Sequence, residues 1–60
     1  MKPGQIMESY QDPLTEQKPE GKVKLLEHFP FAGEKQEGVE QWYVMFLSNG
    51  QKTMRVIKRK

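Results

Sequence analysis

The clearest pattern of hydrophobic and polar positions lies in the C-terminal third of the chain. Two stretches, Val39–Leu47 and Gln51–Arg59, are rich in β-branched and aromatic residues, and Ser48, Asn49 and Gly50 separate them. An Asn-Gly pair between two such stretches is a strong signal for a β-hairpin, because a two-residue type I′ turn needs positive φ at both central positions. We therefore expect two antiparallel strands joined by a tight turn at Asn49 and Gly50.

A two-residue turn would also fix the pairing of the two strands. It sets Met45 opposite Met54, Trp42 opposite Ile57 and Glu40 opposite Arg59. Because side chains alternate between faces along a strand, one face carries Tyr43, Met45, Leu47, Met54 and Val56. The other face carries Trp42, Val44, Phe46 and Ile57, with Thr53 and Arg55 among them. Both faces are apolar, so one is expected to form the core and the other to be covered by barrel curvature, a second layer or a partner. The pattern leaves open which face is inward.

The rest of the chain predicts two more strands, over Gln5–Tyr10 and Gly21–Phe29. In the second of these, Val23, Leu25 and Phe29 are expected to share a face, and Leu26 breaks the alternation in a way that indicates a β-bulge. The stretch from Asp12 to Glu20 contains two prolines and is predicted to be a long loop.

A second loop spans Pro30–Gly38. The element order is therefore strand, long loop, strand, loop, strand, tight turn, strand. This order predicts an all-β fold, a small antiparallel barrel of four to five strands with almost no helix.

Several short motifs resemble those of the small SH3-like barrels, a group that includes KOW-type and Tudor-like modules. They are the opening Pro3-Gly4-Gln5-Ile6, the Gly21-Lys22-Val23 that starts the second strand, and Trp42–Phe46 followed by Asn49-Gly50. The resemblance implies a single SH3-like β-barrel domain over residues 1–60 that acts as a binding module. The short chain, rich in lysine and glutamate, also resembles accessory proteins of phages and mobile elements.

Composition narrows the possible chemistry. The 60 residues contain no cysteine, which excludes disulfides and thiolate metal sites, and no apolar leader or membrane-spanning stretch is evident. We therefore expect a soluble, cytoplasmic protein that does not contact a membrane. His28 is the single histidine and is expected on a strand surface, and no nucleophile or paired carboxylates stand at a catalytic spacing. We expect no enzymatic activity and no cofactor.

Two kinds of partner fit the remaining pattern. The net charge is only +2, but every charged residue after Gly50 is basic. The candidate nucleic-acid-binding residues are Lys52, Arg55, Lys58, Arg59 and Lys60, together with Lys22 and Lys24. The candidate interface residues for a protein partner or for self-association are Tyr43, Met45, Met54 and Val56. We favour protein binding or self-assembly, with nucleic-acid binding as the alternative.

Overall fold

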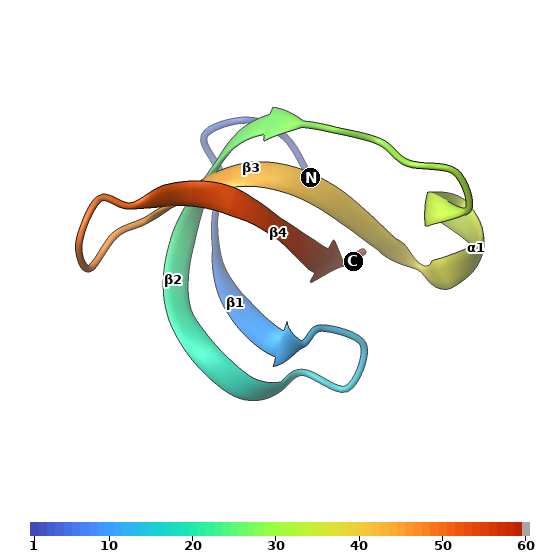
Figure 1. Cartoon of the computed structure of the whole chain (residues 1–60), viewed down its shortest axis with the longest axis horizontal. Helices are drawn as coiled ribbons and strands as arrows, with labels where there is room; N and C mark the ends of the chain where they lie inside the picture. The colour runs from blue at the N-terminus through green and yellow to red at the C-terminus, as the bar shows by residue number, and fades with distance from the viewer. Residues whose placement is uncertain (60) are drawn as a thin grey trace.

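A computed structural model describes residues 1–59 of the chain as a curled, four-stranded antiparallel sheet (Figure 1). Each strand pairs with the next one in sequence, in the order β1-β2-β3-β4. The elements are β1 (Ile6–Asp12), β2 (Gln17–His28), α1 (Glu34–Glu37), β3 (Val39–Phe46) and β4 (Lys52–Lys58). The sheet forms a half-barrel, which confirms the prediction of a small all-β, barrel-like domain.

The core lies on the concave side of this sheet and settles which hairpin face is inward. Burial alternates along β3, where Trp42, Val44 and Phe46 are buried while Tyr43 and Met45 are only half-buried. Trp42 is 2% exposed. The buried cluster consists of Val23, Leu25, Trp42, Val44, Phe46 and Ile57, with Met1 and Met7 packed against it. The opposite, convex side of the sheet is called the outer face below.

The turn between β3 and β4 is longer than the sequence predicts. Met45 pairs with Lys52 and Trp42 with Arg55, a shift of two residues from the predicted register. The connection is a loop over residues 47–50 in which the Gly50 N–H donates to the Phe46 carbonyl at 2.7 Å. Gly50 has a positive φ of 73° and Asn49 does not, so the type I′ turn prediction is wrong. A shift of two preserves the side-chain period of a strand, and the predicted faces are therefore unchanged.

The predicted long loop between the first two strands is also wrong. β1 continues to Asp12 and β2 begins at Gln17, which leaves only residues 13–16 as the connection. The register shifts between Ser9 and Tyr10, and Pro19 lies opposite Tyr10 at this irregularity. A bulge is one of the few places where a paired strand tolerates proline. For this reason Pro19 does not end the ladder.

The bulge predicted at Leu26 is present, and it reverses the faces beyond it. The β2–β3 register shifts between Leu25 and Glu27. After the shift, His28 turns inward and stacks on Trp42, with ring centroids 5.0 Å apart and an interplanar angle of 19°. Phe29 is 41% exposed instead of joining Leu25 in the core, so the predicted shared face of these two residues is wrong. His28 accordingly contacts the core through one face of its ring.

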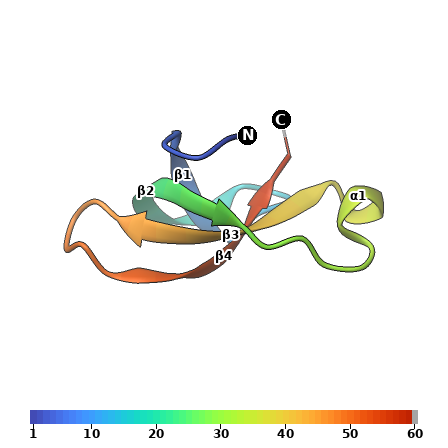
Figure 2. The same ribbon diagram turned by 90° about the horizontal axis from the view of Figure 1, so that it is seen from above.

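The helical turn α1 and the β3–β4 loop project from opposite ends of the half-barrel (Figures 1 and 2). Within residues 1–59 there is no helix with the length and apolar character that a membrane crossing requires.

Candidate binding surface

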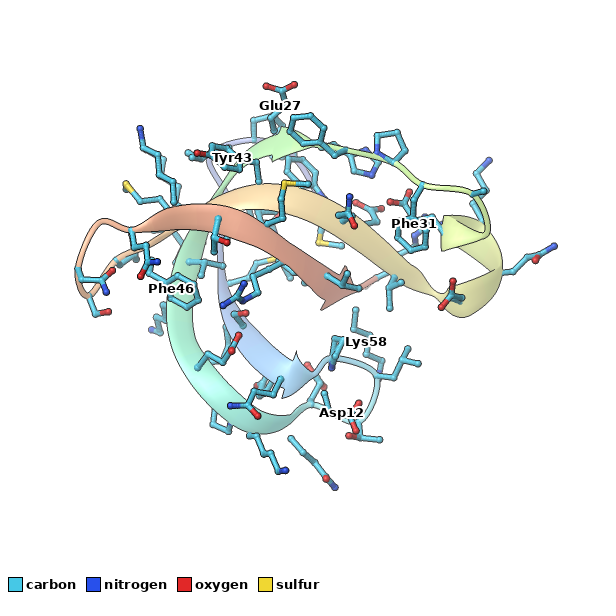
Figure 3. The ribbon with its side chains drawn as sticks, in the orientation of Figure 1. Asp12, Glu27, Phe31, Tyr43, Phe46 and Lys58 are labelled. Carbon is cyan, nitrogen blue, oxygen red and sulfur yellow. The ribbon has the colours of Figure 1, made fainter. Side chains whose placement is uncertain are left out.

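The outer face of β3 and β4 carries an apolar surface that the fold leaves uncovered. Tyr43 pairs with Met54 across the two strands. Leu47 directly follows β3, and side-chain alternation places it on the same face as Tyr43. Leu47 is 44% exposed and Met54 37% exposed. Figure 3 shows Tyr43 and Glu27 on this side of the sheet, whereas Phe46 points to the concave side. The apolar outer surface therefore lies back to back with the core.

The predicted interface residues are brought together on or beside this surface. Tyr43, Met45 and Met54 occupy neighbouring positions of β3 and β4, and Phe29 meets Tyr43 edge-on with ring centroids 6.5 Å apart. Val56 has the same side-chain direction along β4, but it lies where the sheet curls and lines a groove. The four predicted residues therefore lie on one side of the sheet, with Val56 at the margin.

The predicted basic residues do not lie together, and only three of them share the outer face. Lys24 and Lys52 stand opposite Met45 from its two sides, on β2 and β4, and Lys22 follows beside Leu47. These three lysines are exposed on the outer face. The two arginines of the C-terminal strand lie elsewhere, and Lys60 lies outside the described residues. The basic end of the chain is therefore not one continuous cationic patch.

Arg55 forms an ion pair with Glu20 on the concave side of the sheet. Its Nε donates to Glu20 Oε1 at 3.0 Å, and the Ser9 hydroxyl donates to the same oxygen at 3.1 Å. The guanidinium lies over the Phe46 ring, 5.3 Å from its centroid. Because the charge is paired and the guanidinium is held against a ring, Arg55 contributes to the fold and not to an open phosphate-binding surface.

Arg59 joins a second polar network, near α1. Its Nε is buried 3.2 Å from Glu40 Oε2 without hydrogen-bond alignment, and one of its terminal nitrogens lies 3.7 Å from Glu34 Oε1. The Trp42 indole N–H donates to Glu40 Oε1 at 2.9 Å. His28 Nε2 lies 3.0 and 3.1 Å from the two carboxylate oxygens of Glu34. The network ties the end of β2, the start of α1, β3 and the end of β4 together.

Glu34 is the centre of this network and the most buried charged residue in it. Its carboxylate also accepts a hydrogen bond from the Gln41 backbone N–H at 3.0 Å. Burial raises the pKa of Glu34, but the Gln41 hydrogen bond, the His28 contact and the charge of Arg59 outweigh that effect. The net result is a pKa below the ordinary value of 4.5. Glu34 is therefore held as a carboxylate.

A groove follows the open side of the half-barrel, where β1 and β4 are not paired. Its volume is about 240 Å³, and Ile6, Tyr10 and Pro13 line one wall while Val56 and Lys58 line the other. Figure 3 shows Lys58 at this open side, between the end of β4 and the end of β1. The groove contains Glu8 and Glu16 as well as Lys58, so it is not a cationic channel.

Sequence reasoning missed the roles of Glu20 and Glu34. Glu34 is a loop residue in the sequence, and Glu20 is separated from Arg55 by 35 positions. The curl of the sheet brings Glu20 to Arg55, and the fold of the segment around α1 brings Glu34 to His28 and Gln41, so no strand or helix periodicity links these residues. Within residues 1–59, no group of three or more histidine, cysteine or acidic side chains is arranged to hold a metal ion.

No protein-family model matches this chain, and searches of curated proteins and of solved structures return no significant match. The fold is therefore assigned from its own geometry, as a small barrel-like domain of four antiparallel strands.

Proposed function

We propose that this chain is a protein-binding module of the SH3-like type, without catalytic activity, and that the outer face of β3 and β4 is its binding surface. The observation that carries the proposal is the apolar row in which the half-buried Tyr43 and Met45 lie beside the exposed Met54 and Leu47. An antiparallel sheet with one face on the core normally presents polar side chains on the other. A contiguous apolar surface on a small domain marks an interaction site.

The chemistry of this surface suits a protein partner. Methionine side chains are flexible and adapt to irregular apolar surfaces, and Tyr43 offers a ring together with a hydroxyl.

The polar side chains that could have served catalysis are used inside the fold, since His28 contacts both Glu34 oxygens and stacks on Trp42. This use of His28 supports a structural role for it. The cytoplasmic location and the likeness to phage accessory proteins stay predictions.

Nucleic-acid binding is the second candidate, and one observation favours it. Lys22, Lys24 and Lys52 are exposed on the same face as Tyr43, and aromatic rings beside lysines are typical of surfaces that bind single strands. Arg55 and Arg59 are held in internal ion pairs, so two of the cations predicted to contact nucleic acid are not free to do so. Protein binding is therefore the stronger proposal.

Site-specific photocrosslinking tests the proposal. A photoreactive amino acid is placed at Met45 or at Met54, and at Leu14 as the control, because Leu14 is an exposed apolar residue of the β1–β2 connection. The proposal predicts discrete protein adducts from Met45 and Met54 in cells of the source organism and none from Leu14. Equal labelling from all three positions, or adducts to nucleic acid alone, would contradict it.

A further inference from the structure

Three lysines surround the apolar centre of the outer face. Lys24 pairs with Met45 from the β2 side and Lys52 pairs with it from the β4 side. Lys22 lies at the next position along the same face of β2, where its carbonyl accepts the Leu47 N–H at 3.0 Å. We call Lys22, Lys24 and Lys52 the lysine arc. Since neighbouring strands are separated by about 4.8 Å, the Cα atoms of Lys24 and Lys52 stand about 10 Å apart, with Met45 between them.

The charges of the lysine arc are not neutralised inside the protein. The ion pairs of residues 1–59 use Arg55, Arg59 and His28 as their cations, and none of those pairs involves a member of the arc. Two acidic residues share the outer face: Glu8 opposite Lys22, and Glu27 opposite Tyr43. Neither of them stands next to Met45. The region around Met45 is therefore apolar at its centre and cationic on both sides.

We propose that the lysine arc selects an acidic protein segment, one that places an apolar side chain on Met45 and Leu47 and carboxylates beside Lys24 and Lys52. This inference rests on the proposed protein-binding function and adds the chemical class of the partner. Apolar contact at the centre supplies affinity, while complementary charge at the margin fixes orientation and rejects basic partners. A lysine pair on both sides of one apolar position suits a segment in which acidic and apolar residues alternate.

Two other occupants fit these charges less well. A nucleic acid would stack its bases on Tyr43 and Phe29, but this ring pair stands next to Glu27, which repels phosphate. The side chains directly beside the lysines, Met45 and Leu47, are not aromatic. A second copy of the chain presents the same lysines, so a two-fold contact centred on Met45 would set like charges against each other.

Direct binding to defined probes tests the inference. The full chain is titrated by fluorescence anisotropy with a labelled peptide that alternates glutamate and leucine, with the same peptide carrying lysine in place of glutamate, and with oligothymidylate. The double variant Lys24→Glu/Lys52→Glu reverses the arc. Lys18→Glu/Lys35→Glu is the matched control, because it makes the same change in net charge at exposed positions near the β1–β2 connection and on α1.

The inference predicts that the acidic peptide binds and that its affinity falls as salt rises. Reversal of the arc should weaken binding by about tenfold or more, whereas the control should bind like the wild type. Tighter binding of oligothymidylate or of the basic peptide, or equal losses in both double variants, would overturn it. Protein crosslinks at Met45 without binding of the acidic peptide would overturn the partner's chemistry and leave the protein-binding function in place. A dimer that forms through this face would overturn the choice of an unlike partner.

Discussion

The Nε atom of Arg59 lies 3.2 Å from Oε2 of Glu40, although the ladder sets Ile57, and not Arg59, opposite Glu40. The arginine reaches its partner along the diagonal of the sheet. This contact turns the last described residue of the basic strand toward the polar network beside α1. Among the basic residues predicted to bind nucleic acid, the exposed ones within residues 1–59 are therefore Lys22, Lys24 and Lys52 of the outer face. This distinction underlies the proposed selectivity.

The polar network predicts a pH dependence of stability that comes from Glu34. Because its pKa is lower in the folded chain, the stabilisation from Glu34 is complete above the ordinary value of 4.5 and is lost as the pH falls through the folded pKa. We expect Glu34→Gln to lower the melting temperature at neutral pH and to reduce the loss of stability in acid. Thermal unfolding monitored by circular dichroism over acidic and neutral pH measures both effects.

The matched control for Glu34 is Glu37→Gln, which removes an exposed carboxylate from the same helical turn. Its stability curve should follow that of the wild type. If Glu34→Gln also follows the wild type at every pH, then the Glu34 carboxylate does not hold α1 to β2 and β3.

The two faces of the sheet predict unequal costs for the same substitution. Leu25 is fully buried and Leu47 is exposed on the outer face. Leu25→Ala should cost about 2–5 kcal/mol of unfolding free energy because it leaves a cavity in the core. Leu47→Ala should change stability by no more than about 0.5 kcal/mol. Urea unfolding followed by Trp42 fluorescence measures both, and equal costs would show that the inward face is misassigned.

The β3–β4 loop depends on glycine at its last position. Gly50 has φ 73°, and a Cβ built there would meet no atom within 4 Å. The cost of Gly50→Ala is therefore conformational, and we expect it to be about 1–2 kcal/mol. Gly50→Asn should cost less, because asparagine tolerates the left-handed region. A neutral Gly50→Ala, measured by urea unfolding, would be incompatible with this loop.

Arg55 and Lys52 predict unequal costs in stability for the loss of one positive charge. Arg55→Met removes the contact with Glu20 and the stacking on Phe46, and we expect it to cost about 1 kcal/mol, since the guanidinium is partly solvated. Lys52→Met removes an exposed charge and should change stability by no more than about 0.5 kcal/mol. Comparable losses in the two variants, again by urea unfolding, would place both cations in the same role.

The sequence predicts the strands and the two hairpin faces well, because side-chain alternation has a fixed period and a shift of two residues does not alter it. It does not determine the loop, since an Asn-Gly pair also fits a longer connection that needs one glycine at its end. Leu26 signalled the bulge in β2, but whether residues beyond it turn in or out depends on how many positions the bulge displaces. His28 and Phe29 exchanged their expected sides for this reason.

The proposed binding surface was predictable only in part. Tyr43, Met45 and Met54 follow from the hairpin pattern, but the separation of lysines from arginines does not. Arg55 pairs with Glu20 because the sheet curls, and Arg59 reaches Glu34 because α1 folds back beside the end of β4; a local pattern contains no information on either arrangement. The number of basic residues in the last strand therefore overstated the positive charge that is available to a partner, because Arg55 and Arg59 are paired with acidic residues of the same chain.

Methionine methyl groups offer the most direct measurement of the outer face as a binding surface. The chain has four methionines: Met45 and Met54 on the outer face, and Met1 and Met7 packed against the core. In a protein labelled at these methyl groups, titration with the acidic, leucine-containing peptide is followed by nuclear magnetic resonance. The account predicts shifts of the Met45 and Met54 signals with little change at Met1 and Met7. Unchanged spectra, or shifts that centre on Met1 and Met7, would contradict it.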